Sequence, residues 1–401
     1  MYADFEAIVV GGGPAGSTIA AALAESGHRV LLLDKARFPR QKPCSDYINP
    51  AASQLLFDLG VLDDALELGA RRMDGMVVHS PNGAQFTADY ARAEPGRAAL
   101  GLSRKVLDNL LLERAKSHGV HVVEQAHVRE VIQHAGRVAG VVASIDGARE
   151  TLRAPIVIGA DGRNSVIRRA LNLEIPLRWP RKTGLVTHYR NVRDLDRLGE
   201  MHIGQRTYAG FAVIEDGLTN LTIVSDVKDV ANRKGSIDSF FADALESLPE
   251  VSRKLDGAER IGGIRGVGSM GARARRISGD GFLLVGDAAS FLDPFAGEGV
   301  YEAIRGALLA GPIVSAALTA GNCSARPLRS YSLLRHRQFT AKRAVSWIVQ
   351  GFINNPPAMN YVTAHLAERE ELGLTLSGVL GSFQPASRAL SPVFLARLLR
   401  P

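Results

Sequence analysis

The chain opens on a pattern of apolar residues that predicts a strand, a helix and a second strand. Residues 7–10 are all apolar and have the composition of a buried strand. An Ala-rich stretch of helical spacing follows and ends at Gly27. A second apolar run, residues 30–33, then ends on Asp34. This order is that of a β-α-β unit, in which one helix connects two parallel strands.

Between the first strand and the helix, glycines stand at positions 11, 13 and 16 in the spacing Gly-x-Gly-x-x-Gly. The first permits a tight turn, the second lets a phosphate approach the backbone, and the third lets helix and strand pack closely. The helix that begins near Pro14 directs unpaired N–H groups at the same place. Asp34, eighteen residues after Gly16, is placed to accept hydrogen bonds from a ribose. The stretch predicts dinucleotide binding, against the alternative of a merely tight turn.

Two later segments repeat the combination of a buried strand with an acidic residue beside a glycine. The apolar residues 156–158 run into Gly-Ala-Asp-Gly at 159–162, and residues 282–285 run into Gly286-Asp287. The carboxyl ends of parallel strands meet at one edge of a sheet. Both acids are therefore expected to converge on the first glycine loop.

The pattern changes in the second half of the chain. Apolar and polar residues alternate between positions 184 and 227, and this pattern predicts antiparallel strands of a second lobe. Asp216-Gly217 is predicted to be a hairpin turn between two of them. Residues 262–271 are rich in glycine and are predicted to be loop. Helical spacing predicts a helix that begins at Arg104 and is capped by Ser103. It also predicts a helical tail from residue 330 that breaks at Pro356-Pro357.

Composition and charge exclude several classes of protein. The length of 401 residues fits two or three lobes, and hydrophobic and charged contents of 46% and 22% are near average. The net charge of +7 favours an anionic cofactor or a membrane surface. Because the sequence has no dense Lys/Arg run with interleaved aromatic residues, nucleic-acid binding is not expected.

The two cysteines, Cys44 and Cys323, show neither a disulfide framework nor metal-ligand spacing. No metal site is expected from the sequence, and a reducing compartment fits. The first residues lack the charged region of a signal peptide, and the first apolar run carries the glycine motif. A cytoplasmic location is the expectation.

Taken together, GGGPAG with Asp34, the helix-opening Arg104, GADGR at 159–163 and GDAASFLDPFAGEG at 286–299 resemble a known superfamily. It comprises the FAD-dependent enzymes of the p-hydroxybenzoate hydroxylase fold, among them group A flavoprotein monooxygenases, halogenases and geranylgeranyl reductases. The resemblance covers residues 5 to about 320. It implies an α/β fold: a Rossmann-like FAD-binding domain, an inserted antiparallel β-sheet substrate domain and a C-terminal helical region. The expected boundaries are 1–75, 101–171 and 262–325 for the first, 76–100 and 172–261 for the second, and 326–401 for the third.

The resemblance implies FAD as the cofactor and NADPH or NADH as a transient electron donor. The residues expected to bind FAD are Gly11, Gly13, Pro14, Ala15, Gly16, Asp34, Lys35, Arg104, Val128, Asp161, Gly162, Gly286, Asp287, Pro294, Gly297 and Gly299. Arg104 would clamp the phosphates with its planar guanidinium, unless it is a solvated arginine. Asp287 would accept from ribityl or ribose hydroxyls, unless it only caps a helix at Ala288. The helix N-terminus after Gly297 would stabilise negative charge on the reduced flavin.

In hydroxylases of this fold, reduced flavin reacts with oxygen to a C4a-hydroperoxide. The resemblance therefore implies an NAD(P)H-dependent monooxygenase that hydroxylates or epoxidises a lipophilic aromatic, polyketide-like or isoprenoid small molecule. Reduction of isoprenoid double bonds is the alternative. Geranylgeranyl reductases carry Pro-x-x-Tyr-x-x-Cys-Gly-Gly where this chain has Cys44, although Ser45 and Asp46 replace the glycines. The Trp-x-Trp-x-Ile-Pro signature of halogenases is absent from the sequence, and a non-enzymatic flavoprotein is the remaining alternative.

Candidate catalytic residues come from two places, the loop after Asp34 and the predicted substrate sheet. The loop is rich in proline and basic residues and is long for a connector. The candidates are Cys44, Asp46, Tyr47, His188 and Tyr208. For the last four, a satisfied loop or sheet residue is at least an equal alternative, and Cys44 is either a thiol that lines the pocket or a covalent anchor of the flavin.

The C-terminal tail mixes basic residues with Leu, Phe and Trp. This mixture predicts a peripheral contact with a membrane, a lid over a lipophilic site, or a helix packed on the FAD lobe with its charges in water. The sequence assigns neither an oligomeric state nor a choice between NADH and NADPH.

Overall fold

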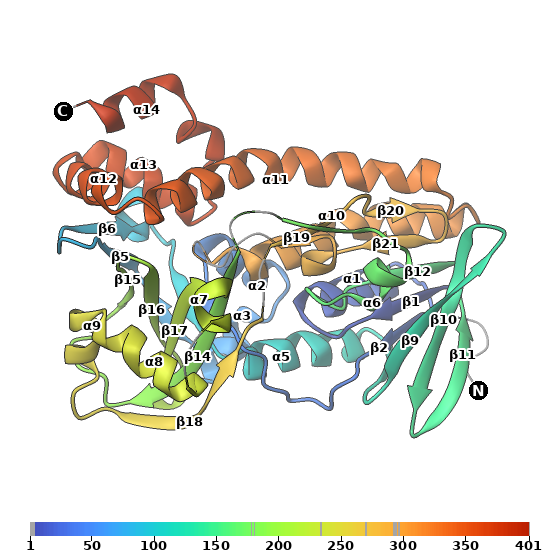
Figure 1. Ribbon diagram of the computed structural model, residues 1–401. Helices are drawn as coiled ribbons and strands as arrows, with labels where there is room; N and C mark the ends of the chain where they lie inside the picture. The colour runs from blue at the N-terminus through green and yellow to red at the C-terminus, as the bar shows by residue number, and fades with distance from the viewer. Residues whose placement is uncertain are drawn as a thin grey trace.

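A six-stranded sheet contains the predicted β-α-β unit and forms the centre of the first lobe (Figure 1). The computed structural model describes residues 5–177, 179, 181–232, 235–268, 271–291, 295 and 297–400. In spatial order the strands are β20 (Ser278–Gly279), β21 (Phe282–Leu284), β12 (Ile156–Gly159), β1 (Ala7–Val10), β2 (Val30–Leu33) and β8 (His121–Val123). All neighbours are parallel except β20 and β21.

Both faces of this sheet are buried. Helix α1 (Pro14–Glu25) lies on one face and packs against α5 (Arg104–Ser117) and α10 (Gly299–Thr319). A three-stranded antiparallel sheet covers the other face and comprises β9 (His127–His134), β10 (Arg137–Ile145) and β11 (Ala148–Arg153). Along β1, Ala7 and Val9 belong to the helical core and Ile8 and Val10 to the core on the opposite face. Because both faces of β1 are buried, all of its residues are apolar and do not alternate with polar ones.

In the described part of the chain, α10 is the one helix whose length and apolar composition would allow it to cross a membrane. It packs against α1 and against α11 (Ala325–Ile353). Ala307, Ala310 and Val314 are completely buried in the core that these helices share. Packing inside the first lobe therefore accounts for the apolar composition of α10.

A seven-stranded sheet forms the second lobe and joins segments that are distant in sequence. In spatial order its strands are β18 (Glu259–Gly266), β14 (Lys182–Arg190), β17 (Thr219–Asp226), β16 (Thr207–Val213), β15 (Leu198–Ile203), β5 (Gly75–His79) and β6 (Gln85–Asp89). The predicted hairpin is confirmed, because β16 and β17 pair antiparallel on either side of Glu215–Gly217. Helices α8 (Ile237–Glu246) and α9 (Pro249–Lys254) pack on the sheet, and α7 (Val227–Ala231) follows β17.

The prediction that residues 262–271 are loop is wrong for the first half of this stretch. Residues 262–266 belong to β18, which pairs antiparallel with β14. A Cβ added at Gly262, Gly263 or Gly266 would meet nothing within 4 Å. β18 is an edge strand held by backbone hydrogen bonds, which need no side chains, so composition did not reveal it.

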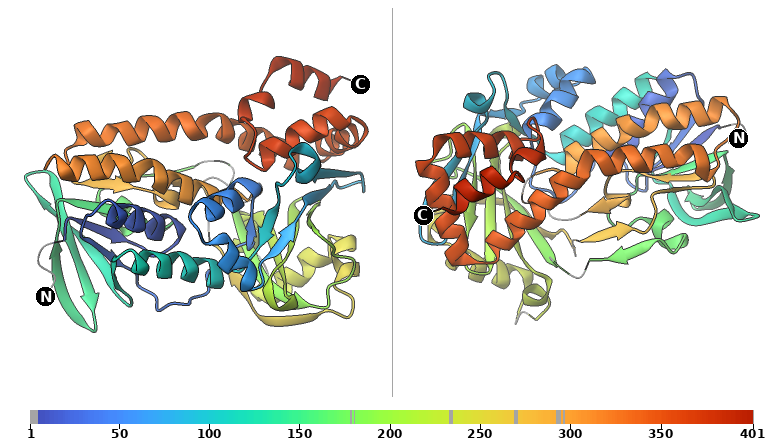
Figure 2. Two further views of the ribbon diagram at one scale, coloured as in Figure 1. Left: turned by 180° about the vertical axis from the view of Figure 1, so that it is seen from behind. Right: turned by 90° about the horizontal axis from the view of Figure 1, so that it is seen from above.

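The C-terminal helices cover both lobes. Helix α11 runs from the first sheet to the second lobe, where α12 (Pro356–Glu368), α13 (Glu370–Leu380) and α14 (Pro392–Leu399) gather (Figures 1 and 2). Helices α12 and α13 contact β6. The predicted break at Pro356-Pro357 is confirmed, because α11 ends at Ile353 and α12 begins at Pro356.

Shorter elements complete the fold. Two small sheets contain β3 (Tyr47–Ile48), β7 (Ala99–Gly101) and β4 (Arg71–Met73), and β13 (Glu174–Pro176), β19 (Ala272–Ala274) and β22 (Ser290–Phe291). The short helices are α2 (Pro50–Asp58), α3 (Leu62–Glu67), α4 (Tyr90–Ala93) and α6 (Val166–Ala170), with single turns at Gly286–Ala288 and Ala386–Arg388. Ser103 caps α5 by accepting from the Val106 N–H, as predicted.

Candidate active site

The glycine loop between β1 and α1 has the geometry of a phosphate-binding turn. Gly11 has a φ of +104°, and a Cβ at this position would stand 2.5 Å from the carbonyl oxygen of Ala160. A Cβ on Gly16 would stand 1.7 Å from the carbonyl oxygen of Gly11. Both positions therefore require glycine for the backbone to turn and for α1 to approach β1.

Gly13 faces open space, and two arginines border that space. The atoms nearest to an added Cβ would be Nη2 of Arg40 at 3.6 Å and Nη2 of Arg104 at 3.8 Å. The buried carboxylate of Asp108 holds both side chains: Arg104 donates to it from Nε at 2.7 Å and from Nη2 at 2.9 Å, and Arg40 Nη1 lies 3.0 Å away. A backbone open to approach and two oriented guanidiniums suit a diphosphate.

Lys42 adds a third cation to this end of the site. Its Nζ would lie 3.8 Å from a Cβ added at Gly162. Burial, and then the positive charge of Arg104, lower the pKa of Lys42 to about 8. A bound anion would raise the pKa again, because it favours the ammonium form.

Asp34 connects the end of β2 to the glycine loop. Its Oδ2 accepts a hydrogen bond from the Gly12 N–H at 2.7 Å, and its Oδ1 accepts one from the Ala36 N–H at 2.8 Å. Each carboxylate oxygen has capacity for another donor. The side chain is therefore oriented at the predicted position and can accept from ribose hydroxyls.

The segment after β12 leaves two buried polar atoms without partners among the described residues. Asp161 Oδ2 accepts from the Val166 N–H at 2.6 Å at the start of α6, but its Oδ1 is unpaired. Burial raises the pKa of Asp161. Nη1 of Arg163 is also unpaired, and its guanidinium lies 5.5 Å from the ring centre of Phe291. Unsatisfied buried groups are rare in folded proteins, so a polar ligand beside Arg163 fits this arrangement.

These segments border one groove. Its lining residues are Gly13, Pro14, Ala15, Lys42, Pro43, Cys44, Ser45, Tyr47, Arg104, Ala160, Gly162, Arg163, Val186, Thr222, Val267, Asp287, Phe291, Gly297, Gly299, Val300 and Ala303.

Asp287 lies in the turn Gly286–Ala288, which β22 follows, so it does not cap an α-helix at Ala288. Pro294 lies outside the described residues. Gly286 packs against α1, since a Cβ there would stand 2.9 Å from the Cβ of Ala15.

Asp46 joins the loop to the substrate sheet. Its Oδ2 lies 2.9 Å from Nε2 of His188 and accepts from Nδ2 of Asn220 at 2.7 Å. Its Oδ1 accepts from the Arg104 N–H at 3.1 Å. Asn220 also donates to the carbonyl oxygen of Cys44 at 2.8 Å. The structure thus brings together three of the five candidate catalytic residues, Cys44, Asp46 and His188.

The two candidate tyrosines, Tyr47 and Tyr208, are also buried. Tyr47 lines the groove, and its hydroxyl is 2.7 Å from that of Tyr90. Burial raises the pKa of Tyr47 well above its ordinary value and that of Tyr90 to about 12, so both phenols stay protonated near neutral pH. Tyr208 is buried and packs edge to face on Phe295, with ring centres 5.4 Å apart. Tyr208 does not line the groove.

Seven described residues expected to bind FAD lie outside the lining of the groove: Gly11, Gly16, Asp34, Lys35, Val128, Asp161 and Gly286. The side chain of Lys35 is exposed at the end of β2. Val128 is buried in the core between the first sheet and β9. The backbone N–H of Ala126, just before Val128, donates to the carbonyl oxygen of Asp34 at 2.8 Å.

Sequence reasoning missed five side chains of this site: Arg40, Lys42, Asp108, Arg163 and Asn220. Arg40 and Lys42 stand in the basic, proline-rich loop, and Arg163 follows the Asp-Gly motif. Asp108 stands four residues after Arg104, the spacing of a helical ion pair. No sequence pattern indicated that Asn220 belongs to the site, because Asn220 lies beside His188 only through the pairing of β14 with β17.

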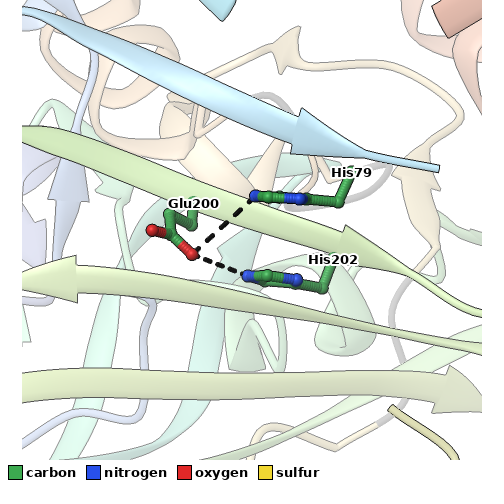
Figure 3. A group of neighbouring side chains, drawn as sticks. All are labelled: His79, Glu200 and His202. Carbon is green, nitrogen blue, oxygen red and sulfur yellow. Dashed lines mark hydrogen bonds and ion pairs between the residues drawn. The ribbon is translucent and has the colours of Figure 1, made fainter. Parts of the chain in front are cut away.

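A separate polar cluster lies on the substrate sheet (Figure 3). The rings of His79 on β5 and His202 on β15 stack, with centres 4.1 Å apart and planes at 8°. Glu200 Oε2 lies 2.7 Å from Nε2 of His202 and 3.9 Å from Nε2 of His79, and Lys254 donates to Glu200 Oε1 at 2.9 Å. Parallel ring planes direct the nitrogen lone pairs side by side instead of toward one point, and Lys254 already pairs with the carboxylate. The geometry therefore favours a buried ion-pair network over a metal centre.

The fold and the groove together define a class of protein. A glycine loop bordered by oriented cations, an acid at the end of β2 and an adjoining antiparallel sheet are the parts of an FAD-dependent oxidoreductase. Residues 4–347 match the family model described as "FAD binding domain", and the chain belongs to that family.

Curated relatives carry several activities. The brominase of 1H-pyrrole-2-carbonyl-(peptidyl-carrier protein) from Pseudoalteromonas luteoviolacea is 27% identical over 344 residues, 82% of each chain. Digeranylgeranylglycerophospholipid reductase 1 of Methanopyrus kandleri is 30% identical over 82% of this chain and 85% of the relative. The 6-methylpretetramide 4-monooxygenase of Streptomyces rimosus is 27% identical over 83% of this chain and 80% of the relative.

Solved structures share the fold. The flavin-dependent brominase Bmp2 superposes with a TM-score of 0.83 at 22% identity, over 94% of this chain and 93% of that one. A geranylgeranyl bacteriochlorophyll reductase-like protein from Thermoplasma acidophilum gives a TM-score of 0.75 at 21% identity, over 96% and 98%. The predicted fold class, a Rossmann-like domain with an antiparallel substrate sheet and C-terminal helices, is confirmed.

Proposed function

We propose that this chain is an NAD(P)H-dependent monooxygenase that transfers one oxygen atom of O2 to a lipophilic aromatic, polyketide-like or isoprenoid small molecule. In a hydroxylation, substrate R–H, O2, NAD(P)H and one proton give R–OH, water and NAD(P)+. The bound FAD supplies the redox chemistry, and the chain supplies binding, orientation and exclusion of water. The observation that carries the proposal is an apolar chamber that adjoins the flavin groove.

The chamber lies between the substrate sheet and the C-terminal helices. Its lining residues are Val78, Phe86, Phe295, Val345, Ile348, Val349, Phe352, Met359, Val362, Thr363, Leu366, Leu376, Leu380, Ala389, Phe394, Leu395 and Leu398. Among the described residues of this lining, Thr363 is the one polar residue and none is charged. A ligand held here must be apolar, because a charge would lose its hydration without gaining a partner.

The chamber lies beside the groove, although no described residue lines both. Phe295, in the wall of the chamber, packs on Tyr208 and stands two residues before Gly297, which lines the groove. The ring of Tyr47 contacts Gly297, since an added Cβ would stand 2.4 Å from Cδ1 of Tyr47. In the proposed reaction an apolar substrate held in the chamber reaches the flavin past Phe295 and Tyr47. A site closed to water strengthens electrostatic interactions and suppresses side reactions with solvent.

The polar end of the site offers a route for a proton. His188, Asp46, Cys44 and Arg104 border a cavity next to the groove. A histidine that is hydrogen-bonded to a carboxylate can relay a proton. In the proposed reaction this pair exchanges protons between the buried site and solvent.

Reduction of an isoprenoid double bond is the second candidate. Cys44 lines the groove between Pro43 and Ser45, where the reductases carry their cysteine motif. The reductase relative from Methanopyrus kandleri is 30% identical, and the chamber would accept an isoprenoid chain equally well. Halogenation is supported by the brominase relative but not by the missing Trp-x-Trp-x-Ile-Pro signature.

Flavin reduction and oxygen consumption separate these activities. The purified protein is expected to bind FAD and to consume O2 in proportion to NADPH or NADH oxidation when a substrate from a panel of aromatic, polyketide-like and isoprenoid compounds is present. Label from 18O2 should enter the product. Product formation without oxygen would contradict the proposal and support the reductase, and a strict requirement for halide would support halogenation.

A charge in the chamber tests the role of the apolar lining. Met359→Lys is expected to reduce substrate-dependent turnover at least about tenfold while flavin absorbance stays unchanged. Val393→Lys is the matched control, because Val393 is exposed on the neighbouring helix α14. Equal turnover in both variants would remove the chamber from the proposal.

A further inference from the structure

A second groove lies on the other side of β22 from the flavin site. Asp287 and Phe291 line the flavin groove, whereas Ala289 and Ser290 line this one. Its other wall is the start of α11. The two grooves are therefore neighbours that share one strand but open separately.

Arginines dominate the lining of this second groove. They are Arg273, Arg275, Arg276, Arg329, Arg335 and Arg343, accompanied by one histidine and three serines. No acidic residue belongs to the lining that the structure describes. Such a concentration of one sign of charge attracts an anion, and guanidinium and hydroxyl donors match phosphate oxygens.

The charges come from two segments that the fold brings together, residues 273–276 and helix α11. Arg273, on β19, stands beside Ser290 of β22 in the paired register. Arg329, Arg335 and Arg343 come from α11, more than fifty residues later in the chain. Neither segment alone would indicate an anion site.

Two of the arginines are held rigidly. Arg335 is 2% exposed and is paired through Nη2 with Glu302 at 3.2 Å, but its Nε is buried without a partner among the described residues. Arg343 donates to the hydroxyl of Ser290 at 2.9 Å. Burial and the neighbouring Arg335 lower the pKa of Arg343, the mark of cations held close together. Arg335 thus fixes a buried positive charge beside the groove, and the exposed Arg275 and Arg329 can donate to a ligand held in it.

We propose that this arginine groove is a binding site for a phosphate ester or diphosphate, separate from the phosphate turn that the flavin uses. Planar guanidiniums on both walls can donate to several oxygens of one phosphate group. The phosphate can belong to a soluble nucleotide, such as an electron donor, or to a lipid headgroup. The site does not depend on which reaction the flavin performs.

Calorimetry with inorganic pyrophosphate tests the site directly. The full chain is first saturated with FAD, so that the turn at Gly13 is filled. The variant Arg275→Gln/Arg329→Gln removes two exposed charges from the groove, and Arg149→Gln/Arg153→Gln on β11 removes the same charge from another exposed surface. Pyrophosphate is expected to bind the wild type and the β11 variant equally, and to bind the groove variant at least about tenfold more weakly.

Two further probes identify the source of the phosphate. Competition between 2′,5′-ADP and pyrophosphate would assign the site to a soluble nucleotide. Sedimentation with vesicles of phosphatidylglycerol, but not of phosphatidylcholine, that is lost in the groove variant would assign it to a lipid headgroup. The proposal is overturned if the FAD-saturated wild type binds no pyrophosphate at millimolar concentration, or if both variants weaken binding equally.

Discussion

Arg104 and Asp108 face each other one helical turn apart on α5, joined by two hydrogen bonds, Nε to Oδ1 at 2.7 Å and Nη2 to Oδ2 at 2.9 Å. The carboxylate is completely buried and also pairs with Arg40. This contact orients both guanidiniums over Gly13. Asp108 therefore sets the position of the two guanidiniums that border the glycine loop.

Replacing this carboxylate by an amide should weaken both the fold and FAD binding. Asp108→Asn leaves two arginines without their counter-charge, and breaking a buried ion pair costs about 3–5 kcal/mol. FAD affinity, measured by quenching of flavin fluorescence, is expected to fall about tenfold or more. Glu113→Gln on the same helix removes an exposed acid and should change neither quantity. An unaltered affinity in Asp108→Asn would show that Arg104 is not a phosphate ligand.

Alanine at Gly13 should impair FAD binding, whereas alanine at Gly16 should impair folding. A Cβ at Gly13 would make ordinary contacts of 3.6 Å and 3.8 Å, whereas one at Gly16 would overlap the backbone of Gly11 at 1.7 Å. Gly13→Ala should therefore keep its melting temperature within a few degrees but bind FAD at least about tenfold more weakly. Gly16→Ala should lose stability outright. Full FAD affinity in a folded Gly13→Ala would contradict the location of the phosphate turn.

The affinity for FAD should depend on pH through Lys42. Its pKa is lowered to about 8 by burial and by Arg104, and the diphosphate of FAD favours the protonated form. Binding should then be constant below pH 8 and weaken by up to about tenfold per unit above it, until the pKa of the complex is reached. Lys42→Met should bind more weakly at pH 7 and lose this dependence. A pH dependence that survives in Lys42→Met would assign it to another group.

The histidine pair on the substrate sheet should make the fold sensitive to acid. Burial, and then the neighbouring His202, lower the pKa of His79 from 6.5 to about 4. The unfolded chain therefore binds this proton more readily, and the stability contributed by neutral His79 is complete above pH 6.5 and declines as the pH falls toward 4. Urea midpoints between pH 7 and pH 4.5 should fall less steeply in His79→Leu than in the wild type. His134→Leu, an exposed residue of β9, is the control and should follow the wild type.

The sequence by itself was sufficient for the local units of the fold. The apolar run into Gly11, the spacing to Asp34 and the cap at Ser103 are satisfied within a few turns of chain. Their physical causes, burial of both faces of a parallel sheet and the φ that only glycine adopts freely, act over short distances. The convergence of Asp287 and Gly162 on one groove followed from the rule that parallel strands end at the same edge.

Only the tertiary structure decided what surrounds these units. Asn220 reaches Asp46 because β14 and β17 pair in one register, and β18 extends the sheet through backbone hydrogen bonds that leave no trace in composition. The apolar chamber and the arginine groove each form where α11 lies over a segment distant in sequence. Contacts of this kind depend on the packing of whole elements, which residue patterns along one segment do not encode.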